Sequence, residues 1–270
     1  RTGIRISTPC LSVNRLCGSG FQSVVNAAQE ISLGESEVVM TGGAENMSLA
    51  PHAVRGIRFG VKLGMDVVME DTLWQGLIDQ QIKTPMGITA ENLAEKYDIS
   101  REDADSFAIR SQQRWAKANA AGVFNDEMAP IEVKTRKGKE MMTADEHPKP
   151  QTTVEQLAKL PPVFKKGGTV NAGNASGICD GAACVILASE EAVTKHNLTP
   201  LARLAGYGIA GCDPHIMGIG PVPAVEGMLK ATGKSLSDID LVEVNEAFAP
   251  QYLAVEKALG LDPEKSNVNG

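Results

Sequence analysis

The strongest constraint on the fold is a glycine-rich turn that joins a short apolar segment to an amphipathic helix near the start of the chain. The apolar segment covers residues 10–13, and helical spacing runs over residues 20–33, where Gly34 supplies a stop. A short buried strand is expected at residues 37–40, closed by a glycine pair. A strand, a helix and a second strand in this order favour a parallel sheet in an α/β protein.

The same alternation returns in the last third of the chain. We expect a central strand over residues 182–188 followed by a helix from Glu190, a half-buried strand over residues 201–210, a helix over residues 221–232 with proline at its start, and a strand over residues 241–244 before a helix that ends at Leu259.

The middle of the chain, about residues 46–166, has a different character. It holds both tryptophans, most of the charged residues, and helices expected at residues 90–96 and 101–119. Ser100 caps the second helix, with Asp103 three residues on in a capping-box arrangement. About 120 residues are too many for a plain loop, so we expect a substantial insertion in the α/β core.

Composition excludes several classes of protein. The 270 residues carry a net charge of −7 and have a pI near 5.2, which argues against a nucleic-acid-binding protein. No apolar run approaches the ~20 residues of a membrane span. Five cysteines without paired spacing and four scattered histidines give no zinc-type cluster, and they favour a reducing compartment.

Cys17 is the sharpest candidate for chemistry. It stands where a strand is expected to turn into a helix, with Gly18 and Gly20 on its C-terminal side. The positive end of a helix favours the thiolate, and its free amide groups suit a developing oxyanion. The alternative is a buried structural cysteine. A dinucleotide-binding loop is rejected, because Ser23 stands where its third glycine belongs.

Two further turns have the composition of ligand sites. Asn245 follows an expected strand and is placed to orient a water or a ligand, although spacing alone favours a helix N-cap. Residues 171–177 form a loop of small residues before a buried strand. That loop permits a slender ligand to approach closely, and tight packing explains it equally well.

Together these segments resemble the signature motifs of the thiolases. Residues 14–20 are similar to the nucleophile motif, residues 245–249 to the second signature and residues 173–177 to the third. The similarity also includes residues 86–92 and 145–153. Within the family, the likeness is greatest to the mitochondrial thiolases of fatty-acid β-oxidation.

The resemblance implies a role for each matching position. Cys17 corresponds to the residue that is acylated, and Asn245 to the residue that holds a water in the oxyanion hole for the thioester enolate. Ser176 matches a contact to the pantetheine arm of coenzyme A (CoA). Thr152 and Lys149 match positions near the nucleotide end of CoA.

The remaining comparisons concern three further substrate-binding positions and two positions where related enzymes carry other residues. Met86, Ala247 and Phe248 correspond to substrate-binding positions. Lys149 stands where the close relatives have arginine, so the charge is kept but the bidentate fork is lost. Pro85 stands where many acetoacetyl-CoA thiolases carry histidine, which favours longer acyl chains.

The implied architecture is the α/β thiolase fold, two similar α/β halves with an inserted loop domain. The N-terminal domain would cover residues 1–45 and 178–196, the CoA-binding loop domain residues 46–177, and the C-terminal domain residues 197–270. The implied reaction is thiolytic cleavage of 3-ketoacyl-CoA, an acyl-CoA, by CoA as co-substrate. No metal or redox cofactor is expected. A homodimer or homotetramer in the mitochondrial matrix is implied.

Two observations qualify this interpretation. The family's catalytic histidine and second catalytic cysteine correspond to positions beyond Gly270, and its early N-terminal strands are also absent, so we expect the 270-residue chain by itself to be inactive. The alternatives are an acetoacetyl-CoA thiolase restricted to four carbons, a ketoacyl synthase, and a non-catalytic, lipid-carrying relative. The intact Cys17 and Asn245 argue against the last of these.

Overall fold

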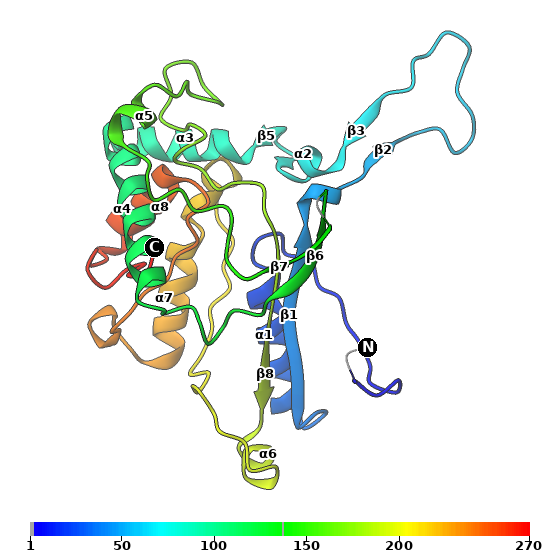
Figure 1. Cartoon of the computed structure of the whole chain (residues 1–270), viewed down its shortest axis with the longest axis vertical. Helices are drawn as coiled ribbons and strands as arrows, with labels where there is room; N and C mark the ends of the chain where they lie inside the picture. The colour runs from blue at the N-terminus through cyan, green and yellow to red at the C-terminus, as the bar shows by residue number, and fades with distance from the viewer. Residues whose placement is uncertain (1–2, 137) are drawn as a thin grey trace. The chain divides into compact units, whose positions relative to one another are not determined.

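The computed structural model describes residues 3–136 and 138–270, and the chain divides into two compact units. The first unit combines Arg1–Leu49 with Cys179–Ala205, and the second combines Ala50–Ile178 with Gly206–Gly270 (Figure 1). Each unit is therefore assembled from segments that lie far apart in the sequence. The division into three domains drawn from the resemblance remains a prediction.

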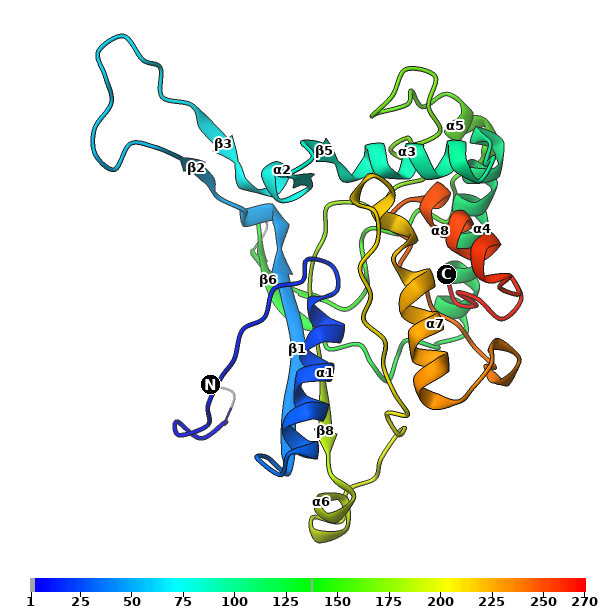
Figure 2. The same cartoon turned by 180° about the vertical axis from the view of Figure 1, so that it is seen from behind.

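The first unit is a helix packed on a pair of antiparallel strands. Helix α1 (Ser19–Ser32) lies along β1 (Val38–Asn46) and β8 (Asp180–Ala188) (Figure 2). The register runs from Val38 opposite Ala188 to Asn46 opposite Asp180. A 3-10 turn, η1 (Met47–Leu49), follows β1, and α6 (Glu190–Lys195) follows β8 as expected.

The expected parallel sheet is wrong for these strands. Residues 10–13 form no strand, and the two strands that do form run antiparallel. Strand β1 also continues through the glycine pair that was expected to close it. At Gly42 a Cβ would lie 2.2 Å from the carbonyl oxygen of Ala183, so a side chain there would clash with β8. Gly42 thus allows β8 to approach. Within the described residues β8 pairs only with β1, so its expected central position is not observed.

Three helices form the core of the second unit: α3 (Met86–Lys96), α4 (Arg101–Ala120) and α8 (Ala249–Leu259). The expected capping box begins α4. Ser100 Oγ accepts a bond of 3.0 Å from the amide of Asp103, whose carboxylate accepts one of 3.0 Å from the amide of Ser100. Such a cap stabilises a helix by about 1 kcal/mol. The first turn of α4 is thereby fixed.

Tyr252 on α8 is the largest fully buried side chain of this core. Its ring stacks on Phe107 of α4, with 4.3 Å between the ring centroids. Its hydroxyl has no hydrogen-bond partner among the described residues, although Ser266 lies near it. Burial, reinforced by the charge of Glu256, raises the pKa of Tyr252 to about 12.

The second unit also contains further elements. They are the hairpins β2 (His52–Val54) with β3 (Met69–Asp71), β4 (Ile78–Asp79) with β5 (Thr84–Pro85) and β6 (Ile131–Thr135) with β7 (Gly138–Met142), and the helices α2 (Thr72–Gly76), α5 (Val154–Ala158), η2 (Pro214–Ile219), α7 (Pro221–Thr232) and η3 (Leu236–Asp238). Helix α7 matches its expected bounds. The strands expected at residues 201–210 and 241–244 do not form, and the second region makes only an isolated bridge at Val242.

The loop between β2 and β3 carries a run of exposed apolar residues. Phe59 and Leu63 are almost wholly exposed, with relative accessibilities of 98% and 106%, and Ile57, Val61, Met65 and Val67 are exposed as well. Figure 1 shows this loop extending beyond the two short strands. Exposed apolar surface concentrated in one segment marks a site of interaction more often than single exposed residues do.

Candidate active site

Cys17 stands in a tight turn directly before α1. The turn is closed by the amides of Gly18 and Ser19, which donate to the carbonyls of Arg15 and Leu16 at 3.0 Å each. Leu16 adopts a left-handed conformation, with φ at +48°. Gly18 is the N-cap of α1, so Cys17 immediately precedes the helix, in the positive field of its N-terminus.

Exposure does not separate the five cysteines, because all of them are exposed. Cys212 differs in its environment: its thiol donates to the carbonyl of Met217 at 3.5 Å, and burial raises its pKa. Of the five cysteines, all within the described residues, Cys17 alone lies within two residues of the start of a helix of more than eight residues. Position therefore distinguishes Cys17 as the nucleophile candidate.

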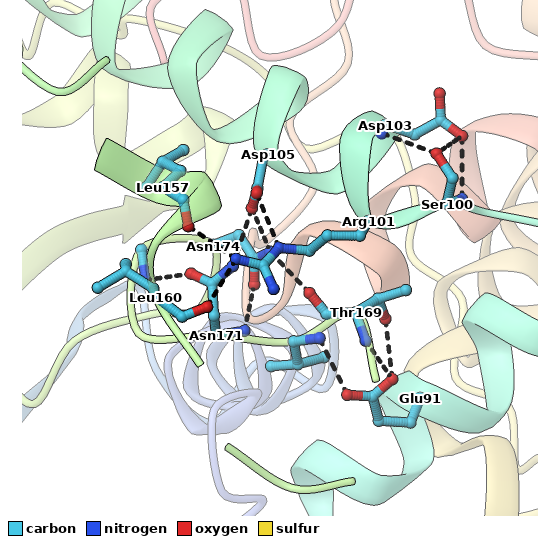
Figure 3. A network of polar contacts seen from close by, with 12 residues as sticks. Glu91, Ser100, Arg101, Asp103, Asp105, Leu157, Leu160, Thr169, Asn171 and Asn174 are labelled. Carbon is cyan, nitrogen blue, oxygen red and sulfur yellow. Dashed lines mark hydrogen bonds and ion pairs between the residues drawn. The ribbon is translucent and has the colours of Figure 1, made fainter. Parts of the chain in front are cut away.

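The loop of small residues is fastened to α3 by a buried carboxylate. Glu91 is only 2% exposed, and its carboxylate accepts bonds from the amide and hydroxyl of Thr169 at 2.8 and 2.9 Å and from the amide of Val170 at 2.9 Å (Figure 3). Gly168 leaves room for it, because a Cβ there would lie 2.3 Å from a Glu91 oxygen. The loop begins at a fixed point on α3.

A second buried carboxylate, Asp105 of α4, holds the centre of the same loop. One of its oxygens accepts bonds from the amide groups of Asn171 and Asn174, at 2.9 and 2.8 Å, and the other pairs with Arg101 at 2.7 Å (Figure 3). Arg101 also donates to the carbonyl of Leu157. Buried charges are stable when paired and hydrogen-bonded in this way. Neither Glu91 nor Asp105 was predicted as a site residue.

Two of the three motifs meet in the second unit. The amide of Ser176 donates to the carbonyl of Ala247 at 2.9 Å, and the amide of Ala249 donates to that of Asn174 at 2.9 Å. The hydroxyl of Ser176 donates to the carbonyl of Glu246 at 2.9 Å. These bonds place Ser176 beside Ala247, two candidates that are 71 positions apart in the numbering.

Asn245 is exposed and does not cap a helix. The N-cap of α8 is Phe248, three residues further on, and the side chain of Asn245 has no hydrogen-bond partner within the described part of the chain. The N-cap interpretation that spacing favoured is therefore wrong. An exposed amide without an internal partner is free to bind a water or a ligand, since it carries both donors and an acceptor.

Gly87, next to Met86, and Phe248 are connected by Phe164, which was not predicted as a site residue. The Phe164 ring meets Phe248 edge to face, with 6.0 Å between centroids and an interplanar angle of 86°. The same ring lies against Gly87, where a Cβ would be 2.2 Å from it. Phe164 thus fills the space between the start of α3 and Phe248. Its position in the sequence, followed directly by Lys165 and Lys166, gave no signal of this role.

Lys149 and Thr152 form one turn. The hydroxyl of Thr152 donates to the carbonyl of Lys149 at 2.7 Å, and the amide of Lys149 donates to Gln112 of α4 at 2.7 Å. The residue Lys149 is exposed. His147 connects this segment with the loop of small residues, because its imidazole lies 2.0 Å from the position of a Cβ at Gly177. His147 was not predicted as a site residue.

Cys17 belongs to the first unit, and the other seven candidates belong to the second. Among the described residues, no group of three or more His, Cys, Asp or Glu side chains is arranged to hold a metal ion. In the same part of the chain, no helix is long and apolar enough to cross a membrane.

Comparison with known proteins identifies the family. The model of the thiolase N-terminal domain matches residues 1–191, and that of the thiolase C-terminal domain matches residues 198–270. The chain belongs to the thiolase family. It is 68% identical to the mitochondrial 3-ketoacyl-CoA thiolase of Bos taurus over 270 residues, which are 100% of this chain and 68% of the bovine protein.

Solved thiolase structures agree. The crystal structure of human mitochondrial 3-ketoacyl-CoA thiolase matches at a TM-score of 0.97 and 67% identity, covering 99% of this chain and 68% of the human one. The human enzyme in complex with CoA matches at a TM-score of 0.96 and 66% identity, covering 99% and 67%. The α/β thiolase fold expected from the three motifs is confirmed. The roles of the individual residues remain predictions.

Proposed function

We propose that this thiolase cleaves 3-ketoacyl-CoA with free CoA, giving acetyl-CoA and an acyl-CoA two carbons shorter, in fatty-acid β-oxidation. The decisive observation is Cys17, held in a glycine-flanked turn at the start of α1, in a chain 68% identical to a protein named for this reaction. The same residues run the reaction in reverse as a condensation.

Cys17 acts as the nucleophile in two steps. Its thiolate attacks the 3-keto carbon, and the bond between C2 and C3 then breaks with its electron pair passing to C2. The enolate of acetyl-CoA that results takes up a proton at C2, and the acyl group stays on the sulfur. Free CoA gives up its thiol proton, which balances the proton taken up at C2; its thiolate attacks this thioester, and Cys17 leaves as the thiolate.

Asn245 stabilises the enolate oxygen through a bound water. Its exposed side chain, without an internal partner, supports this role, because fixed donors directed at developing charge supply a large part of enzymatic rate enhancement. Ala247 follows it on the same extended segment, beside Ser176.

Coenzyme A is the co-substrate, and no metal or redox group takes part. Its pantetheine arm passes Ser176, and its nucleotide end lies near Thr152 and Lys149. Met86 and Phe248 form the apolar wall. The contacts of Phe164 and of His147 with the neighbouring segments support one continuous ligand surface along this unit.

Two alternative functions differ from the proposed one in ways that an assay can measure. An acetoacetyl-CoA thiolase would use the same residues on a four-carbon substrate, and Pro85 at the N-cap of α3 favours the longer acyl chains instead. A non-catalytic, lipid-carrying relative would have no use for a cysteine at a helix start. Turnover of 3-ketoacyl-CoA substrates of four to sixteen carbons would separate the three.

We also infer a homo-oligomer in the mitochondrial matrix. The exposed apolar loop between β2 and β3 supports self-association, since such a surface is costly to leave in water. The bovine and human relatives are named as mitochondrial proteins, which supports the compartment. Protease protection of the native protein in purified mitochondria, before and after rupture of the inner membrane, tests the matrix assignment.

Brief iodoacetamide labelling of the native, whole enzyme at neutral pH tests the nucleophile. Cys17 should be modified ahead of Cys10, Cys179, Cys184 and Cys212, with loss of activity in parallel. Acetyl-CoA added beforehand should protect Cys17 alone. Faster labelling of another cysteine, with activity surviving, would overturn the assignment.

Asn245→Asp tests the oxyanion role. The N-cap of α8 is Phe248, so Asn245→Asp removes no helix cap and should leave the melting temperature unchanged. A carboxylate facing the enolate should lower kcat by about 10²–10³, the loss typical of one oxyanion donor. A variant with near-normal kcat would reject the role.

A further inference from the structure

The segment before α8 presents alternate side chains to opposite sides. Val242 and Val244 pack against the core and Glu246 is half-buried, whereas Glu243 and Asn245 are exposed. Successive side chains of an extended backbone point to opposite faces. The side of the segment that Asn245 faces is therefore determined by where its neighbours on either side are held.

Glu246 is held at both carboxylate oxygens. The hydroxyl of Ser111 on α4 donates to Oε2 at 2.7 Å, and the side-chain amide of Asn267 donates to Oε1 at 2.7 Å. Its main-chain carbonyl accepts the hydroxyl of Ser176 at 2.9 Å. Three segments of the chain thus converge on this one residue.

Asn267 makes the attachment rigid. It is 5% exposed, and its side chain pairs with both backbone groups of Val244, accepting from the amide at 2.8 Å and donating to the carbonyl at 2.8 Å. The residues before and after Asn245 are consequently both tied to the same asparagine, and Asn245 between them has little freedom to rotate inward.

We propose that Glu246 is a positioning residue for the thiolase reaction, which fixes the direction of the Asn245 side chain and the place of the Ser176 hydroxyl. This proposal rests on the proposed function of Asn245. Glu246 faces away from Asn245, and acts through the backbone that both share.

The test is a double-mutant cycle on the enzyme. Glu246→Ala should lower kcat by about tenfold to a hundredfold, less than the loss of the donor itself. In the Asn245→Ala background the same change should lower kcat by less than about threefold, because residues that act as a unit are non-additive. Glu246→Gln should recover most of the loss, since the Ser111 hydroxyl is able to turn and accept from the new amide.

Two controls distinguish positioning from general destabilisation. Glu256→Ala removes a partly buried carboxylate on α8 that pairs with Arg110 at 3.2 Å, and it should affect melting but not kcat. Ser111→Ala removes one of the two donors and serves if Glu246→Ala does not fold; its kcat loss should also vanish in the Asn245→Ala background.

Each outcome decides a separate question. Equal losses of kcat from Glu246→Ala with and without Asn245 would overturn the positioning role of Glu246 while leaving the proposed role of Asn245 intact. If Glu246→Ala does not fold, equal losses of kcat from Ser111→Ala in the two backgrounds would overturn the positioning role in the same way. If Asn245→Ala itself keeps the wild-type kcat, the proposed function of Asn245 fails, and the rate of Cys17 alkylation then shows whether the nucleophile assignment survives.

Discussion

Replacing Glu91 with glutamine tests whether α3 anchors the loop of small residues. The carboxylate accepts three hydrogen bonds, two from Thr169 on one oxygen and one from Val170 on the other. Glutamine keeps the shape but supplies only one acceptor oxygen. In its better orientation the amide oxygen faces Thr169, and the amide nitrogen faces the N–H of Val170.

The cost follows from these contacts. Val170 is 0% exposed, so its N–H loses its acceptor with no water to replace it, which costs about 1–3 kcal/mol. The two bonds to Thr169 lose the charge on their acceptor, and charge-assisted bonds are roughly twice as strong as neutral ones. Burying an amide in place of a carboxylate offsets part of this. We expect a net loss of about 2–4 kcal/mol.

Hydrogen exchange measured by mass spectrometry on peptides covering residues 166–178 reads this loss locally. Each 1.4 kcal/mol is a factor of ten, so the amide of Val170 should exchange about 30- to 1000-fold faster. The matched control is Glu95→Gln, one turn along α3, where the side chain is 64% exposed and pairs with Lys165. An exposed pair contributes only about 0–1 kcal/mol, so the control should change exchange by less than about fivefold. Equal effects of the two substitutions, or no effect of Glu91→Gln, would refute the anchoring argument.

Three further predictions concern separate features. Tyr252→Phe removes a buried hydroxyl that has no hydrogen-bond partner among the described residues, so stability at neutral pH should stay within about 1 kcal/mol of wild type. Because the pKa of Tyr252 is raised on folding, its contribution to the free energy of unfolding is present below the unfolded pKa and is lost as pH rises from about 10 to about 12. The variant has no hydroxyl to ionise, so it should resist alkaline unfolding better, as followed by circular dichroism. Replacing Phe59 and Leu63 together by Asp should shift the sedimentation profile towards smaller species without changing helix content. Lys149→Ala should raise the KM for CoA by less than about fivefold, because an exposed charge pair contributes only about 0–1 kcal/mol; a large fall in kcat at constant KM would contradict its role at the nucleotide end.

Local signals predicted the helices well. The capping box at Ser100 and the proline at the start of α7 lie within one turn of the element they define, and both elements have the expected bounds within one residue. Strands were predicted less well, because a strand depends on a partner that can be anywhere in the chain. Strand β1 finds its partner in β8, beyond the whole of the middle segment.

The site was predicted where its residues share a motif and was missed where they only support it. Phenylalanine is an unusual N-cap residue, so the spacing predicted the N-cap of α8 at Asn245, three residues before its actual place at Phe248. Glu91 and Asp105 are acidic residues on helices, where most such residues face water. Their burial follows from contacts with Thr169, Asn171 and Asn174, and helical periodicity alone could not indicate that.

The left-handed conformation of Leu16 has an evolutionary consequence. Such a residue costs about 1–2 kcal/mol in strain, whereas glycine would relieve the strain but add about 0.5–1 kcal/mol of chain entropy on folding. Because these terms offset each other to within about 1 kcal/mol, selection for folding alone would favour glycine over leucine only weakly at this position. The residue found at this position should therefore be decided mainly by selection on the function of Cys17. A descendant lineage that abandoned the chemistry would let position 16 vary freely, whereas one that kept it would accept only residues that preserve the turn holding Cys17.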